Sequence, residues 1–116
     1  MTAATFRRLA LDLPEAVESA HMDHPDFRVG GKIFATLGAP STGWAMVKLP
    51  PAEQARLLTA APAMFVPAAG AWGRGGATLV RLRAADPATI RRALRVAWRE
   101  RAPAALVEAT DAIDAG

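Results

Sequence analysis

The chain contains no cysteine, and this absence removes several kinds of site at once. A disulfide framework, a thiol nucleophile and a cysteine-ligated zinc or iron–sulfur centre are all excluded. Histidine is scarce as well, with His21 and His24 the only two in the chain. A chain without cysteine is typical of a reducing compartment, so we expect a cytoplasmic protein.

Long apolar runs are also missing. No segment approaches the ~20 residues needed to span a bilayer. The apolar part of the N-terminal MTAATFRRLALDLPE is short and broken by Asp12, unlike a signal peptide. We therefore expect no membrane association. The 116 residues, 52% of them apolar, suffice for one domain over residues 1–116 with a real hydrophobic core.

Positive charge exceeds negative charge only modestly. Lys and Arg number 14 against 11 Asp and Glu, which gives a net charge of +3. Lys32 and Lys48 are the only lysines, so arginine carries most of the positive charge. The many arginines, alanines and prolines indicate a GC-rich coding source, which makes the arginine excess partly compositional. The charge therefore permits a polyanionic partner without requiring one.

Helical segments flank and interrupt the predicted strands. Caps, prolines and apolar periodicity predict helices from Thr2 or Thr5 to about Pro14, over 51–61 with Gln54 toward water, from Asp86–Pro87 to about Pro103, and over 104–113. Short β-rich runs predict strands over 64–66 and 77–82. The order helix, three strands, helix, two strands and one or two helices predicts an α+β domain, α-β3-α-β2-α, with helices packed on an antiparallel sheet.

The stretch from His24 to Leu49 supplies the middle of that sheet. A strand beginning near Val17 is expected to bend at residues 21–26 and to end over 27–29. Gly30–Gly31 then predicts a tight two-residue turn, because its central residues need positive φ. Further strands are expected over 32–37 and 44–49.

Alternation along these strands predicts two different faces. The aliphatic face holds Ile33, Ala35, Leu37, Ala45, Val47 and Leu49, and the mixed face holds Lys32, Phe34, Thr36, Trp44, Met46 and Lys48. Helices on the aliphatic face would leave a basic, aromatic face open, as in several nucleic-acid modules. If Phe27 and Val29 join Lys32 and Phe34, however, the mixed face becomes apolar enough to be core, and both assignments stay open. The expected core includes Ile33, Ala35, Val47, Leu49, Val80 and Leu94.

One cluster has metal-ligand chemistry: His21, Asp23, His24 and Asp26. No further ligand is spaced elsewhere, so we expect a polar bend in which Asp26 accepts bonds from nearby backbone N–H groups, and no metal site. Nothing in the sequence raises a carboxyl pKa or supplies an oriented nucleophile. We expect no catalytic residue, no cofactor and no enzymatic activity.

Two basic segments allow a functional and a structural interpretation. The loop from Gly70 to Gly76 could cradle a phosphate with Arg74 assisting, or could connect two strands with Trp72 packed on the edge of the core. The arginines at 91, 92, 95 and 99 could follow a nucleic-acid backbone or form a solvated helix face. The structural interpretation is favoured in both cases.

Five segments together resemble the MmcQ/YjbR family of small bacterial proteins. In order along the chain they are HPDFRVGGKIFATL, WAMVKL, PPAEQARLL, FVPAAGAWGRGGATLVRL and IRRALRVAWRERAP. The resemblance covers about residues 6–106, and its most specific pieces are Gly31–Phe34, Lys48–Leu49, Trp72–Gly73 and Ala97–Trp98.

This resemblance implies a fold related to the CyaY-like and secretion-chaperone-like domains. It also implies the family's usual description as a DNA-binding protein with a double-wing arrangement. Lys32, Lys48 and Arg74 match the family pattern and could touch an anion, and Arg28 is added from this sequence alone. The expected partner is double-stranded DNA, bound through phosphates with weak sequence preference. The alternative is a module that binds a protein, a second copy of the chain in a homodimer, or a small anionic ligand.

Overall fold

The computed structural model describes residues 1–115. Its elements, in chain order, are α1 (Ala3–Leu11), β1 (Val17–His21), β2 (His24–Val29), β3 (Lys32–Leu37), β4 (Trp44–Lys48), α2 (Pro51–Ala60), β5 (Phe65–Pro67), α3 (Gly70–Arg74), β6 (Ala77–Arg81), a 3-10 turn η1 (Leu82–Ala84), α4 (Pro87–Arg101) and α5 (Ala104–Ala115). Among these residues, no helix is long and apolar enough to cross a membrane.

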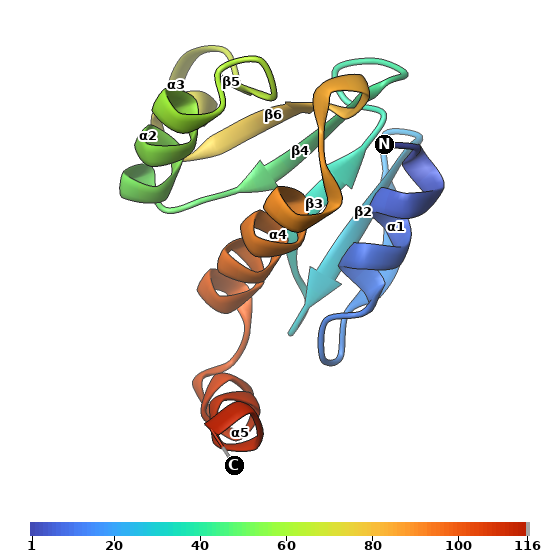
Figure 1. Ribbon diagram of the computed structural model, residues 1–116. Helices are drawn as coiled ribbons and strands as arrows, with labels where there is room; N and C mark the ends of the chain where they lie inside the picture. The colour runs from blue at the N-terminus through green and yellow to red at the C-terminus, as the bar shows by residue number, and fades with distance from the viewer. Residues whose placement is uncertain (116) are drawn as a thin grey trace.

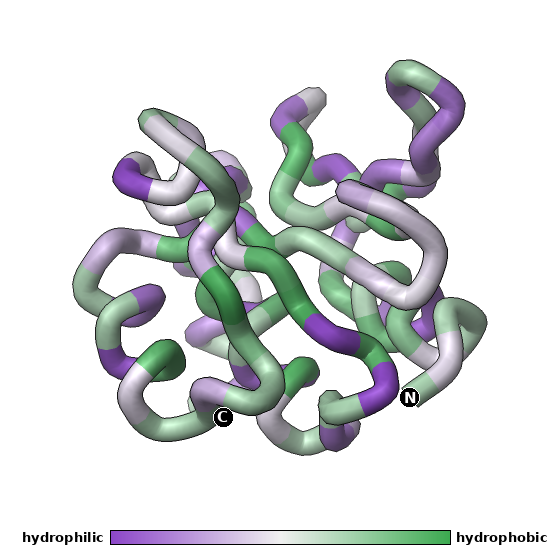
Figure 2. The backbone as a smooth tube through the Cα atoms, turned by 90° about the horizontal axis from the view of Figure 1, so that it is seen from above, coloured by the Kyte–Doolittle hydropathy of each residue, from purple (hydrophilic) through white to green (hydrophobic). Residues whose placement is uncertain are grey.

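The strands form one antiparallel sheet in the order β1-β2-β3-β4-β6-β5. Helices α1 and α4 lie across one face of this sheet, α2 and α3 lie at its β5–β6 side, and α5 lies beyond the end of α4 (Figure 1). The hydrophobic stretches run through the middle of the fold (Figure 2). The expected α+β class, with helices packed on an antiparallel sheet, is confirmed.

Capping fixes where two of the helices begin. Thr2 accepts a hydrogen bond from the Thr5 backbone N–H at 3.1 Å and caps α1. Asp86 caps α4 by accepting from the Thr89 N–H at 2.9 Å, and Pro87 follows at the first helical position. The Asp86 start was predicted, and Thr2 is one of the two caps that were predicted for the first helix.

Two hairpin turns shape the first half of the sheet. Gly30 and Gly31 have φ of 58° and 79°, which confirms the predicted two-residue turn. Met22 and Asp23 also have positive φ, 49° and 65°, so a second two-residue turn divides the expected bent strand into β1 and β2. The prediction of three strands before α2 was therefore wrong, because a turn without glycine separates two of the four.

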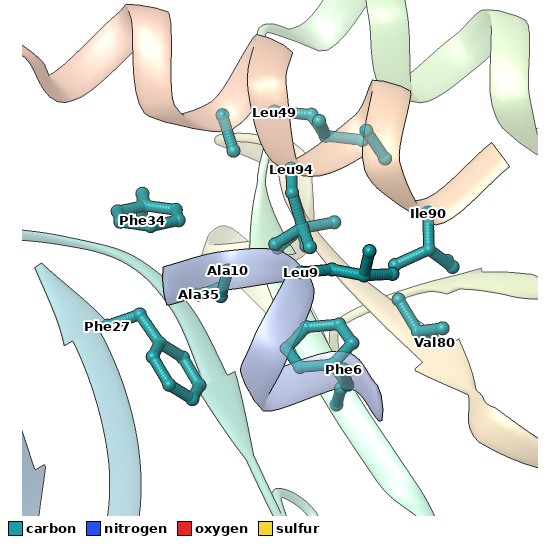
Figure 3. Close-up of a cluster of buried hydrophobic side chains, with 14 of the residues drawn as sticks. Phe6, Leu9, Ala10, Phe27, Phe34, Ala35, Leu49, Val80, Ile90 and Leu94 are labelled. Carbon is teal, nitrogen blue, oxygen red and sulfur yellow. The ribbon is translucent and has the colours of Figure 1, made fainter. Parts of the chain in front are cut away.

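A β-bulge in β3 changes which side chains share a face. Phe27 pairs with Ala35 and Arg28 pairs with Ile33, so the pairing passes over Phe34. Phe34 joins the buried cluster under α4, as Figure 3 shows, and Ile33 turns to the other face and is only half-buried. The prediction that Ile33 is a core residue was wrong.

The rest of the expected core is confirmed. The helix-covered face buries most of the predicted aliphatic set together with three phenylalanines (Figure 3), and these buried residues are Ala35, Leu37, Ala45, Val47, Leu49, Val80, Leu94, Phe6, Phe27 and Phe34. Trp98 is almost fully buried, and its indole N–H donates to the Pro14 carbonyl at 2.9 Å. This bond ties α4 to the segment that follows α1.

Candidate nucleic-acid interface

Of the four predicted contact residues, Arg28 is already engaged within the protein. Its guanidinium donates to both carboxylate oxygens of Asp26, at 2.8 and 3.0 Å. His21 Nδ1 lies 2.7 Å from the same carboxylate, whose side chain is fully buried. The hydrogen bonds from Arg28, and then those from His21, hold the pKa of Asp26 below its ordinary value although burial opposes this.

This arrangement gives the His21–Asp26 segment a structural role. Asp26 binds the Arg28 and His21 side chains, so the expectation that it binds backbone N–H groups was wrong. Across residues 1–115, no three His, Asp or Glu side chains gather closely enough to hold a metal ion. Arg28 is removed from the candidate contacts because its charge is already neutralised.

The other three predicted residues lie at one end of the sheet. Lys32 begins β3, Lys48 ends β4, and Arg74 lies just before β6. Because β3, β4 and β6 are successive antiparallel neighbours, these positions come to the same end. Lys32 pairs with the buried Val29, however, and therefore lies on the helix-covered face. Lys48 lies with Met46 on the other face of the sheet. The prediction that both lysines share a face was wrong, because the bulge at Phe34 reverses the alternation.

A cavity of about 170 Å³ joins Lys48 to a residue that the sequence did not single out, Arg101 at the end of α4. The lining is completed by Ala71, Trp72, Gly75 and Ala77. Burial, and then the positive charge of Arg101, lower the pKa of Lys48. Arg101 is one of twelve arginines in the chain, and no local pattern distinguishes it.

No acidic side chain among residues 1–115 forms an ion pair with Lys48 or Arg101. Within the same residues, the buried Nε of Arg101 has no hydrogen-bond acceptor. Glu100 lines a neighbouring hollow with both cations but is bonded to neither. Arg101 also lies next to the Lys32 turn, since a Cβ on Gly30 would lie 4.0 Å from the Arg101 carbonyl. We call Lys32, Lys48, Arg74 and Arg101 the basic end of the sheet.

Two backbone donors at the end of the glycine-rich segment are bonded within the protein. The Gly75 N–H donates to Ala71 and Trp72 carbonyls and the Gly76 N–H to Gly73, so these donors are already used. A Cβ on Gly76 would lie 1.8 Å from the Leu49 carbonyl, which leaves no room for a larger residue. The segment is a strand connection, as favoured, but it contains the short helix α3. Trp72 is 67% exposed, although it was expected to pack on the edge of the core.

Gln54 holds this connection in place from α2. Its side-chain amide is buried and donates to the carbonyls of Gly73 and Ala77, at 2.9 and 3.2 Å, and to the Thr78 hydroxyl at 3.1 Å. The prediction that Gln54 points toward water was wrong. One of these partners, Ala77, also lines the neighbouring Lys48–Arg101 cavity.

The arginine face of α4 is partly covered by acidic side chains. Arg99 pairs with Asp111 of α5 at 2.5 Å, and Arg95 pairs with Asp114. Arg92 lies 3.7 Å from Glu53 of α2. The prediction of a solvated arginine face is therefore only partly right, because two of these arginines form ion pairs that link α4 to α5.

Comparison with known proteins agrees with this architecture. A crystal structure of Deinococcus radiodurans protein DR2400, with the domain DUF419, is similar with a TM-score of 0.71 and 19% sequence identity, over 84% of this chain and 75% of that chain. At that identity the likeness shows the fold. The YjbR family model matches residues 11–100, and the chain belongs to the YjbR family. No curated protein matches the chain.

Proposed function

We propose that this YjbR-family protein binds duplex DNA through its phosphate backbone, without catalysis and with weak sequence preference. The observation that carries the proposal is the unneutralised pair Lys48 and Arg101 at the basic end. The buried Asp26 and the partly buried Glu53 carboxylates, in contrast, have arginine partners. Two neighbouring cations that pair with no acidic side chain in the described part of the chain attract a polyanion such as a phosphate backbone.

The contacts proposed are the four residues of the basic end. Lys32 and Arg74 are exposed on either side of the recessed pair, and Arg101 takes the place of Arg28 in the predicted set. Phosphate contacts position a protein on DNA and carry no base information directly, which accounts for the weak sequence preference.

The test is fluorescence anisotropy with an internally labelled duplex whose ends carry hydroxyl groups, repeated over several salt concentrations. Log affinity should fall by about 0.9 per log unit of salt for each phosphate contacted. Lys32→Ala, Lys48→Met, Arg74→Ala and Arg101→Met should each weaken binding on every sequence and reduce the slope by about one contact.

Arg91→Met is the matched control, because it removes one exposed arginine of α4 outside the basic end. It should leave the slope unchanged. A folded protein that does not bind the duplex at low salt would end the DNA proposal, and equal effects of all five substitutions would contradict the assignment to the basic end.

The small-anionic-ligand alternative is favoured by a separate observation. Lys48 and Arg101 line a cavity, whereas a surface that only follows a backbone would carry exposed cations. Binding of a small anion by a protein that does not bind the hydroxyl-ended duplex would support that alternative.

A further inference from the structure

The Lys48–Arg101 cavity differs in shape and charge from an ordinary backbone-contact surface. It is bounded on one side by the small residues Ala71, Gly75 and Ala77, and its two charged side chains are both half-buried. A phosphate inside a nucleic-acid strand carries a sugar on both sides, so a recess limits its approach. A terminal phosphate has one ester bond and three free oxygens, and it can enter such a recess.

We propose that this cavity binds the terminal phosphate monoester of a nucleotide, with the attached base stacked on Trp72. The nucleotide is either the phosphorylated end of a DNA strand or a free mononucleotide. In its first form, the inference rests on the proposed DNA binding and specifies which part of the DNA is recognised.

Charge matching supports a monoester over a diester. A phosphate monoester carries about −1.5 to −2 near pH 7, whereas a backbone phosphodiester carries a single negative charge. Lys48 and Arg101 together supply two positive charges, and a guanidinium can form charge-assisted hydrogen bonds with phosphate oxygens. A bound dianion would also favour the charged form of Lys48, which burial and Arg101 now disfavour.

Trp72 supplies the second part of the site. Trp72 lines the cavity and is 67% exposed, while Trp98 is buried and Trp44 lies under the Arg81 guanidinium at 5.2 Å. An exposed indole next to an anion site is a stacking surface, and aromatic stacking accepts any base. The combination of anion site and stacking surface therefore predicts binding of a nucleotide without base preference.

The cavity walls are held in place before any ligand binds. Gln54 donates to the carbonyls of Gly73 and Ala77, which belong to the α3–β6 segment lining the cavity. The Gly75 and Gly76 N–H groups close the turn after α3. Less side-chain and backbone ordering is then required on binding, which favours affinity for a small ligand.

Calorimetry with 2′-deoxyadenosine 5′-monophosphate, deoxyadenosine and inorganic phosphate tests the inference. The nucleotide should bind at least about tenfold more tightly than either part alone, because the site uses both parts. Lys48→Met and Arg101→Met should each weaken nucleotide binding by about tenfold, since each loses a bond to a charged group while keeping an apolar stem. Arg91→Met should bind as the unmodified protein does.

Trp72→Leu removes the stacking surface and keeps the two cations. Because Trp72 is largely exposed, the variant should fold normally. It should weaken nucleotide binding by about fivefold or more and leave inorganic phosphate binding unchanged. A nucleotide that binds no better than inorganic phosphate, or that binds equally to the Lys48→Met variant, would overturn the inference.

Duplexes of one sequence with phosphate or hydroxyl ends distinguish the two sources. Tighter binding of the phosphorylated duplex, lost in the Arg101→Met variant, assigns the cavity to DNA ends. Equal binding of both duplexes together with specific nucleotide binding assigns it to free mononucleotides. Binding of the hydroxyl-ended duplex without nucleotide binding overturns this inference and leaves the proposed function standing. Nucleotide binding without binding of either duplex overturns the proposed function alone.

Discussion

Two groups of charged side chains sit on the same sheet and differ in how their charge is balanced. Asp26 is buried but is bound by Arg28 and His21. Lys48 is partly buried and shares its cavity with another cation, Arg101. In the first group the carboxylate charge is balanced by neighbouring side chains, so the group contributes to the stability of the fold. The second is left open, and an uncompensated charge pair in a cavity is more typical of a binding site.

The largest difference between the two groups should appear when one charge is removed from each. Asp26→Ala leaves Arg28 and His21 without their shared carboxylate, and we expect it to lower the free energy of unfolding by about 3 kcal/mol. Lys48→Met should leave stability unchanged or raise it slightly, because it removes a repulsion from Arg101. Urea unfolding of both variants measures the difference, and equal losses would show that both groups are structural.

Gln54 bonds the α3–β6 connection beside the Lys48–Arg101 cavity, and its removal should lower the free energy of unfolding by less than the removal of Asp26. Gln54→Ala removes three hydrogen bonds and leaves buried carbonyls at Gly73 and Ala77 without this donor. We expect a loss of about 2 kcal/mol in unfolding free energy. Thermal or urea unfolding provides the measurement, and Gln54→Glu would be a poor rescue because a carboxylate cannot donate. A midpoint unchanged by Gln54→Ala would mean that the α3–β6 connection holds itself in place.

The pH dependence of stability should separate the groups by pH range, because Asp26 acts in acid and Lys48 in alkali. The pKa of Asp26 is lowered on folding, so its contribution is present above the unfolded pKa of about 3.9 and is lost as pH falls through the lower folded value. The pKa of Lys48 is also lowered, so between its folded value and about 10.4 the unfolded chain binds more protons and stability rises with pH.

Comparing the unmodified protein with Asp26→Asn and Lys48→Met isolates each contribution. Asp26→Asn should reduce the loss of stability in acid, and Lys48→Met should remove the gain in alkali. The second effect is the smaller, because Lys48 remains partly accessible to water. An acid profile unaffected by Asp26→Asn would contradict the role given to its ion pairs.

The same two groups show what local sequence can and cannot predict. The bounds of β3, the Gly30–Gly31 turn and the Asp86 cap were predicted because each depends on residues adjacent in the chain. The bulge at Phe34 was missed because an extra residue is defined only against the partner strand. That single residue places Lys32 and Lys48 on different faces.

The pairing of Arg101 with Lys48 was missed for the same physical reason. Arg101 meets Lys48 only after α4 has packed on the sheet, so no spacing along the chain could reveal the pair. The Arg28–Asp26 pair was not anticipated because Asp26 was expected to bind the backbone. The turn at Met22–Asp23 was missed because it contains no glycine, the residue that usually indicates a two-residue turn in a sequence. Aspartate does tolerate positive φ better than most residues.

The most direct test of the open charge pair is a thermal unfolding experiment with an added anion. The unmodified protein, Lys48→Met and Arg91→Met are heated with increasing 2′-deoxyadenosine 5′-monophosphate at constant ionic strength. A ligand that binds the native state raises the unfolding temperature by mass action. The unmodified protein and Arg91→Met should rise together, while Lys48→Met should respond much less. An equal rise in all three proteins, or no rise in any, would contradict the claim that Lys48 and Arg101 form an anion site.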